Sequence, residues 1–104
     1  MSNKPLELHP EALAEADSAL LWYRERSAKA ARAFIAEIQR ALNRVVESPQ
    51  RWPVAKAGWR RYPLRRFPYF VVYQEMPDYI LILAVAHGRR RPGYWRARMT
   101  QQEI

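Results

Sequence analysis

Residues 85–95, with the sequence VAHGRRRPGYW, combine a histidine, three arginines, a tyrosine and a tryptophan at the end of an apolar run. Cleavage of RNA by attack of its own 2′-hydroxyl requires a base, an acid for the leaving oxygen, and a cation that stabilises the phosphorane. His87, Tyr94 and Arg91 are the candidates for these three roles. The same stretch is also consistent with a basic docking surface, or with a histidine and two aromatic rings that close a small core.

His87 has no acidic partner close to it in the sequence. Glu75 and Asp78 belong to the far end of the hairpin expected in this region, which weakens any triad-like arrangement. We therefore interpret His87 as a histidine that is hydrogen-bonded at the end of a strand and orients the C-terminal segment. Tyr94 and Trp95 are interpreted as packing groups, because aromatic side chains bury large areas in a small domain.

The net charge of +8 is confined to the second half of the chain. Residues 1–50 carry seven Lys or Arg and seven Asp or Glu, whereas residues 51–104 carry eleven basic residues and three acids. Almost all of this excess is arginine, whose planar fork of donors suits phosphate or carboxylate groups. The asymmetry predicts an anionic partner, either a nucleic acid or an acidic protein surface.

The arginines of the second half gather mainly in two groups, at 60–66 and at 89–91. For the first group, a surface that binds a partner and a charged strand edge that prevents aggregation are equally good interpretations. The second group lies at a strand end beside a histidine and a tyrosine, and we favour binding there. We predict that contacts with the target or another partner come from Arg65, Arg66, Arg89, Arg90 and Arg91.

Length and composition narrow the class of protein further. The 104 residues predict one domain over 1–104. Cysteine is absent, and His9 and His87 lack metal-ligand spacing, so we expect neither a metal nor a cofactor. The sequence shows neither an apolar leader nor a stretch long enough to span a bilayer, which predicts a cytoplasmic protein without membrane contacts.

Two helices are expected in the first half. Pro10 occupies a first helical position, and apolar residues then recur at helical spacing, which predicts a helix over 10–26. Ser27 is the expected N-cap of a second amphipathic helix that ends at Ser48-Pro49. Because the connection is so short, the two helices should form a hairpin.

Strands are expected at the N-terminus and throughout the second half. Pro63 predicts that the first strand of the second half lies at an edge of the sheet. The expected fold class is α+β, with an N-terminal strand and a helical hairpin packed on a small antiparallel sheet. The four strands are predicted at 6–8, 59–67, 69–75 and 79–87.

This layout resembles the RelE/ParE superfamily of type II toxin–antitoxin toxins, from about residue 6 to 98. The matching pieces are HPEALAEADSALLWY, RAFIAEIQRALNRVVESPQRWP, RRYPLRRFPYFVVYQE and ILILAVAHGRRRPGYW. The resemblance implies a small basic toxin that is neutralised by a cognate antitoxin protein. It also implies one of two activities: RelE-like members cut mRNA on the ribosome, whereas ParE-like members poison DNA gyrase.

Phe70 separates these two activities. In the relatives that cut mRNA, an arginine typically stands directly before an apolar pair and a tyrosine in the middle strand. Here the matching stretch is FVVY, residues 70–73, so Phe70 occupies the place of that arginine. The helix facing the ribosome is also lysine-rich in RelE-like members, whereas the second helix here mixes basic and acidic residues. The resemblance therefore favours a ParE-like toxin that binds DNA gyrase. The alternatives are a ribosome-dependent mRNA endoribonuclease, with His87, Arg91 and Tyr94 as its site, and a basic nucleic-acid-binding module.

Overall fold

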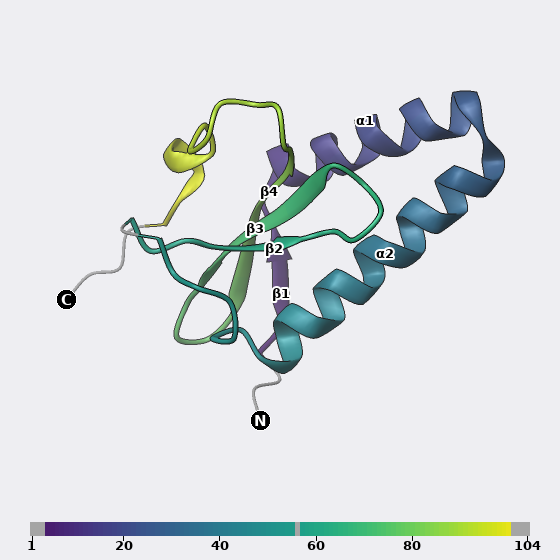
Figure 1. The fold of residues 1–104 in the computed structure, drawn as a ribbon. Coiled ribbons are helices and arrows are strands. Elements are labelled where there is room, and N and C mark those ends of the chain that lie inside the picture. Colours follow the sequence, from purple (N-terminus) through teal and green to yellow (C-terminus); the bar gives the residue numbers. More distant parts are fainter. Residues whose placement is uncertain (1–3, 56, 101–104) are drawn as a thin grey trace.

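The computed structural model describes residues 4–55 and 57–100, and it confirms the α+β class and the expected order of elements (Figure 1). A short 3₁₀ helix follows the last strand. Three strand boundaries differ from the prediction: the strand expected over 59–67 begins at Arg60 and ends at Pro63, and the strand expected from residue 79 begins at Ile80. The elements are β1 (Leu6–Leu8), α1 (Pro10–Arg26), α2 (Ala28–Glu47), β2 (Arg60–Pro63), β3 (Tyr69–Glu75), β4 (Ile80–His87) and the 3₁₀ helix (Arg96–Arg98).

The sheet has the strand order β1-β4-β3-β2, which confirms β2 as an edge strand. β2, β3 and β4 form the expected antiparallel meander. β1 joins β4 in parallel, with Leu6 opposite Ile80 and Leu8 opposite Ile82, so the complete sheet is mixed rather than antiparallel. No tight turn joins β1 to β4, since the whole helical hairpin lies between them in the sequence, and the direction of β1 is therefore not constrained by a turn.

Ser27 makes the hairpin of α1 and α2 tight. Its backbone N–H donates to the carbonyl of Tyr23 and so closes α1, while its side chain accepts from Ala30 N at 3.1 Å and caps α2. One residue thus ends one helix and begins the next. At the start of α1, the imidazole of His9 accepts from Glu11 N at 3.1 Å, and Pro10 occupies the first helical position, as predicted.

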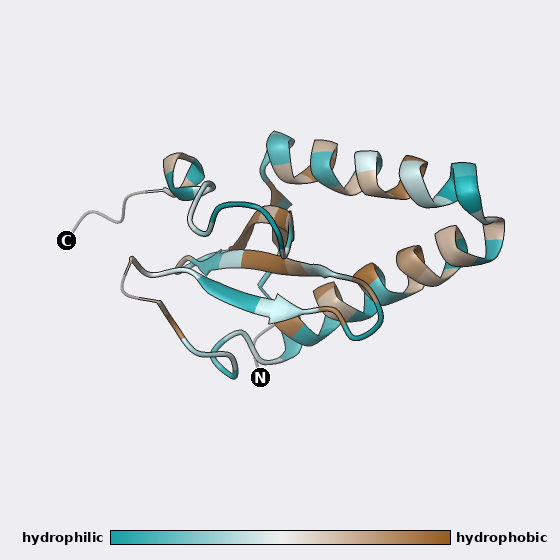
Figure 2. Ribbon diagram, turned by 45° about the horizontal axis from the view of Figure 1, so that its top comes forward, coloured by the Kyte–Doolittle hydropathy of each residue, from teal (hydrophilic) through white to brown (hydrophobic). Residues whose placement is uncertain are grey.

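The helical hairpin covers one face of the sheet. Phe34, Ala41 and Val45 of α2 are buried against the same cluster as Val71 and Ile82 of the sheet. α1 buries only small residues completely, which lets its backbone approach the sheet closely. Figure 2 shows the hydrophobic positions gathered in the central strands and the hydrophilic ones in β2 at the edge.

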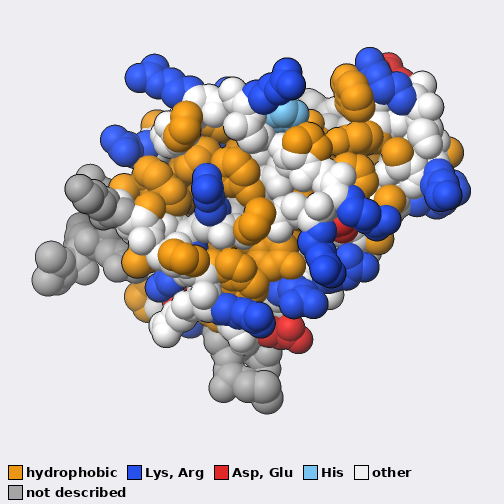
Figure 3. Space-filling model, in the orientation of Figure 1, with side chains coloured by type: hydrophobic (Ala, Val, Ile, Leu, Met, Phe, Trp, Pro, Cys, Tyr) orange, Lys and Arg blue, Asp and Glu red, His pale blue; other side chains and the backbone are white. Residues whose placement is uncertain are grey.

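The opposite face of the sheet is covered by the segment that follows β4. Trp95 is only 2% exposed and packs with Val72, Leu83 and Ala86. β4 is therefore buried on both faces, which explains why its sequence is a continuous apolar run rather than an alternating one. Figure 3 shows Lys and Arg side chains around hydrophobic ones on the side where β2 and the C-terminal segment lie, with few acids among them.

β4 extends past the end of its neighbour β1. β1 pairs only with Ile80–Ile82, so the edge of β4 from Leu83 onward has no neighbouring strand on that side. The register against β3 also shifts there, because Val72 lies opposite Ala84 and Tyr73 opposite Ile82. This irregularity leaves backbone groups of β4 that need partners other than a strand.

Glu37 fixes the turn between β2 and β3. Its side chain is buried, although it is charged, and its carboxylate accepts from Arg65 N at 2.9 Å and Arg66 N at 3.1 Å. The Arg66 guanidinium adds an ion pair at 3.2 Å. A buried carboxylate is tolerated because its lone pairs are occupied, and the turn 64–68 is thereby attached to α2.

We expect Glu37→Ala to lower the free energy of unfolding by about 2–4 kcal/mol, because two backbone donors and a guanidinium lose their acceptor together. The matched control is Glu47→Ala, which removes an exposed acid from the same helix and should change stability by less than about 0.5 kcal/mol. Urea unfolding followed by circular dichroism measures both. Equal losses in the two variants would contradict the role assigned to Glu37.

Candidate functional site

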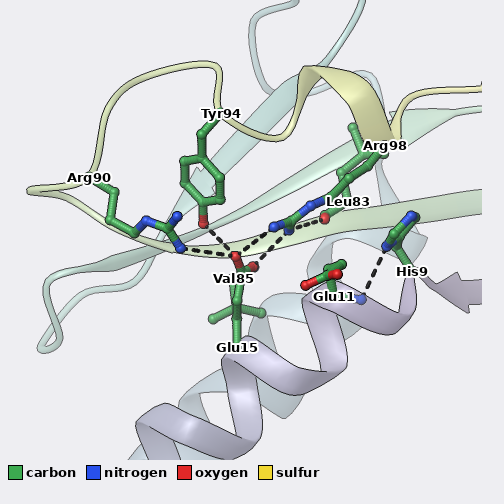
Figure 4. A network of polar contacts seen from close by, with 8 residues as sticks. All are labelled: His9, Glu11, Glu15, Leu83, Val85, Arg90, Tyr94 and Arg98. Atoms are coloured by element: carbon green, nitrogen blue, oxygen red, sulfur yellow. Dashed lines mark hydrogen bonds and ion pairs between the residues drawn. The ribbon is translucent and has the colours of Figure 1, made fainter.

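Glu15 of α1 connects three elements through one carboxylate (Figure 4). Its Oε1 accepts from Val85 N at 3.0 Å and from Arg98 Nη1 at 3.0 Å. Its Oε2 accepts from Tyr94 Oη at 2.8 Å and from Arg98 Nη2 at 3.0 Å. Arg90 forms a longer ion pair with the same oxygen at 3.5 Å. The carboxylate thus ties α1 to the edge of β4 and to the C-terminal segment.

Arg98 completes the cover of the β4 edge. Its Nη1 also donates to the carbonyl of Leu83 at 3.0 Å, so Glu15 and Arg98 together bind the N–H of Val85 and the carbonyl of Leu83. These are backbone groups that β1 is too short to reach. The Glu15–Arg98 pair is itself largely shielded from water, with exposed side-chain fractions of 14% and 13%.

Tyr94 lies inside this network. Burial, the hydrogen bond to Glu15 and the charge of Glu15 raise its pKa to about 12, although Arg90 and Arg98 act in the opposite direction. Both guanidinium groups lie over the phenol ring, at 3.8 Å for Arg90 and 5.1 Å for Arg98. The phenol proton is held by Glu15, which makes Tyr94 a weaker acid than a free tyrosine.

His87 shapes the turn at the end of β4. Its Nδ1 accepts from Arg89 N at 3.0 Å, and its ring packs edge-on against Tyr69 with 5.0 Å between the ring centres. The carbonyl of His87 also accepts from Arg90 N at 3.0 Å. The side chain is therefore hydrogen-bonded at the strand end, in the structural role interpreted from the sequence.

The three candidates for RNA cleavage are not brought together. In the described part of the chain, no hydrogen bond, ion pair or ring contact joins His87 to Tyr94 or Arg91. A cavity of about 710 Å³ between α1 and the end of the sheet is lined by His87 and Arg90, but by neither Tyr94 nor Arg91. The acid that does contact Tyr94 is Glu15, which lies 79 residues earlier in the sequence and was missed there.

The two arginine groups meet only in part. Gly88 N donates to the carbonyl of Pro68 at 2.8 Å, so the turn 64–68 and the segment 88–91 lie at the same end of the sheet. Arg65 and Arg66 are carried on that turn. Arg60 instead donates from β2 to the carbonyls of Gln50 and Trp52, and Arg61 lies over the ring of Phe70.

The five arginines predicted to bind a partner divide into two kinds. Arg66 and Arg90 are exposed but committed to ion pairs with Glu37 and Glu15. Arg65, Arg89 and Arg91 are also exposed, and none of their guanidinium groups forms a hydrogen bond, ion pair or ring contact within residues 4–55 and 57–100. These three side chains are the ones available to an anionic partner.

Phe70 is a packing residue of the C-terminal face. It lies in β3 opposite Ala86, with its ring 5.8 Å from that of Trp95 and the Arg61 guanidinium 4.9 Å above it. The position where mRNA-cutting relatives are expected to place an arginine is thus apolar. Arg61 approaches this position from β2, and its guanidinium lies over the Phe70 ring.

A helical hairpin on one face of a four-stranded mixed sheet, with an arginine-rich C-terminal segment on the other, is the architecture of a RelE/ParE-type toxin. Residues 6–92 match the family model of the ParE toxin of the type II toxin–antitoxin system parDE, and the chain belongs to this family. Its fold is similar to a chain of the chromosomal ParDE TA system from P. aeruginosa, with a TM-score of 0.61 and 19% identity over 82% of this chain and 96% of that one. No curated protein sequence matches this chain.

Two further observations concern ligands and membranes. Among the described residues, no group of three or more His, Asp or Glu side chains is arranged to hold a metal ion. Neither helix in the described part of the chain is long and apolar enough to cross a membrane.

We expect Glu15→Ala to lower the pKa of Tyr94 from about 12 and to leave it above the ordinary value of 10.0, because burial, the largest cause of the rise, remains while the hydrogen bond and the charge of Glu15 are removed. In the wild type, the folded pKa lies above the ordinary one. The stability that neutral Tyr94 contributes is therefore complete below about pH 10 and is lost as the pH rises toward 12.

Tyrosine labelled with ¹³C at Cζ and titrated by NMR measures this pKa directly. Tyr73 provides the internal control: its pKa is also raised to about 12, mainly by burial, and Glu15 is not among the causes. A Glu15→Ala variant that stays folded while Tyr94 still titrates with Tyr73 would refute the coupling.

Proposed function

We propose that this ParE-family chain inhibits growth by binding DNA gyrase, and that Arg65, Arg89 and Arg91 provide its main contacts. The observation that carries the proposal is that these three guanidinium groups are exposed at one end of the sheet and pair with none of the described residues. Arginines with free donors favour acidic protein surfaces and steer association through their charge. The target would place the chain in the cytoplasm, and no cofactor is required for this activity.

The chemistry and the surroundings of the candidate catalytic side chains favour binding over mRNA cleavage. Phe70 cannot stabilise a phosphorane, because it carries no donor. Tyr94 is a poor acid at neutral pH, since its proton is bound to Glu15 and its pKa is raised. Among the described side chains, neither residue forms a hydrogen bond, ion pair or ring contact with His87, and neither Tyr94 nor Arg91 lines the cavity that His87 lines.

A cognate antitoxin is the second proposed partner. The cavity of about 710 Å³ between α1 and the sheet is lined by Trp22, Tyr23 and Tyr69, which suits the apolar face of an amphipathic segment. Leu21 and Trp22 are about half exposed on α1 and extend this apolar surface beyond the cavity. A segment bound there would lie beside Arg90 and His87, close to the proposed gyrase contacts.

Arg89→Ala combined with Arg91→Ala is expected to raise the concentration needed to inhibit gyrase supercoiling by at least about tenfold, because two free charges at the contact are lost. The control is Arg32→Ala with Arg40→Ala, which removes two exposed arginines from α2 and the same total charge. Thermal unfolding should show all variants folded. Equal inhibition by both double variants and the wild type would exclude 89–91 as the contact.

The mRNA-cleaving alternative is tested in a translation-coupled cleavage assay. We expect the wild type to leave translated mRNA intact. If it cuts mRNA, and if His87→Ala and Tyr94→Phe each abolish cutting while the antitoxin still binds, the activity is that of an endoribonuclease. The gyrase proposal would then be replaced rather than modified.

A further inference from the structure

A second cavity, of about 660 Å³, lies on the side of the sheet that carries Trp95, between β2, the loop before it and the C-terminal segment. The cavity is apart from the helical hairpin and from the surface proposed above for the antitoxin's amphipathic segment. Its apolar wall consists mainly of tryptophan and proline side chains. These are Trp52, Trp59, Trp95, Pro53, Pro63 and Pro92.

Among the described residues, the charged side chains that line this cavity are two guanidinium groups, Arg61 and Arg96. Arg61 lies 4.9 Å above the ring of Phe70, and Arg96 lies 5.4 Å above that of Trp59. Neither donates a hydrogen bond or forms an ion pair within the described residues. Stacking a guanidinium on a ring leaves its N–H edge free, and that edge matches a carboxylate in a bidentate arrangement.

Trp95 lines the cavity with its ring and does not provide an exposed donor. Its indole Nε1 is the one buried side-chain nitrogen or oxygen in the described part of the chain without a hydrogen-bond partner, and it is shielded from a bound ligand. The side-chain donors that the described lining residues offer to a ligand are therefore the guanidinium groups of Arg61 and Arg96, and no acid is among these residues.

The arrangement suits an acidic peptide better than a nucleotide. A nucleobase needs an open ring face on which to stack. Here Arg61 covers one face of Phe70 and Arg96 one face of Trp59, while Trp95 packs edge-on against both rings. Proline and tryptophan walls accept proline or leucine side chains, and the free guanidinium edges accept carboxylates.

We propose that this cavity binds an acidic segment of the antitoxin, with a proline or leucine between the tryptophans and carboxylates on Arg61 and Arg96. The proposal rests on the proposed toxin function only for the identity of the partner. It adds a second contact, on the opposite side of the sheet from the helical hairpin. One flexible partner chain would then hold both faces of the toxin, which raises affinity through effective concentration.

The probe is an acetylated, amidated octapeptide in which glutamates alternate with leucine and proline, added to the uniformly ¹⁵N-labelled full chain. The control peptide has glutamine in place of every glutamate. The four tryptophan indole signals are followed by NMR, and single Phe variants of Trp22, Trp52 and Trp59 assign them. We expect the indole signals of Trp52, Trp59 and Trp95 to shift with the acidic peptide and that of Trp22, on α1, to remain in place.

The variant Arg61→Ala with Arg96→Ala should weaken the peptide at least about tenfold, because two charge-assisted contacts are lost. Arg32→Ala with Arg40→Ala removes the same charge from α2 and should change the affinity less than about twofold. Equal losses in both double variants, a shift at Trp22 alone, or equal binding of the glutamine peptide would overturn the proposal. Displacement of the acidic peptide by a thymidine oligonucleotide at lower concentration would assign the cavity to nucleic acid instead.

Failure of this proposal is separable from failure of the proposed function. Growth arrest and gyrase inhibition by the wild type are measured without any peptide. If the chain inhibits gyrase but does not bind the peptide, the cavity proposal alone is contradicted. Peptide binding by a chain that does not inhibit gyrase would contradict the proposed gyrase target and leave the cavity proposal intact.

Discussion

The arrangement of the second half of the chain depends on the hydrogen bonds and the ion pair that the Glu15 carboxylate forms with Val85, Tyr94 and Arg98. β1 ends at Leu8, opposite Ile82, and the edge of β4 beyond that point must find other hydrogen-bond partners. Glu15 and Arg98 provide them, at Val85 N and at the Leu83 carbonyl. A charged pair at this depth is stable only because each member is hydrogen-bonded on several sides. By meeting this need, the pair also fixes the C-terminal segment on the sheet.

The attached segment creates the functional surfaces as a consequence. Trp95 is placed against β3 and β4, which closes the second face of the sheet and forms one wall of the cavity of about 660 Å³. The turn after His87 is placed beside the turn 64–68, so Arg65 is brought to the same end of the sheet as Arg89 and Arg91. A surface assembled from segments this far apart in the sequence requires a link of this kind.

The elements were predictable because their signals are local. Pro10 and Ser27 mark helix starts whatever the rest of the chain does, and the apolar run of β4 indicates a central strand covered on at least one face. The parallel pairing of β1 and the register shift near Leu83 were not predictable, since both arise from contacts between distant segments. The residues alone predicted the order of the elements, whereas the direction of β1 is known only from the structure.

Glu15 and Glu37 were missed for a physical reason that also suggests how to find such residues. Each is one acid among several on its helix, although a buried apolar residue lies three positions before it and another four positions after it. Glu15 lies between Ala12 and Ala19 on the face of α1 that meets the sheet. A carboxylate in that position must be either strained or multiply hydrogen-bonded, and in an arginine-rich chain the second outcome is the stable one.

The partnering of the arginines, more than their number, then determines what the surface can do. Arg66 pairs with the buried Glu37, and Arg90 and Arg98 share the partly buried Glu15, so these three arginines serve the fold. A guanidinium held in this way has little capacity left for an external phosphate or carboxylate. Arginines that pair with no acid among the described residues, such as Arg65 and Arg91, stay hydrated until a partner binds. They lie on turns rather than beneath a reactive group. This distribution favours docking, because these positive charges lie on the turns at one end of the sheet, while the position of Phe70 is apolar.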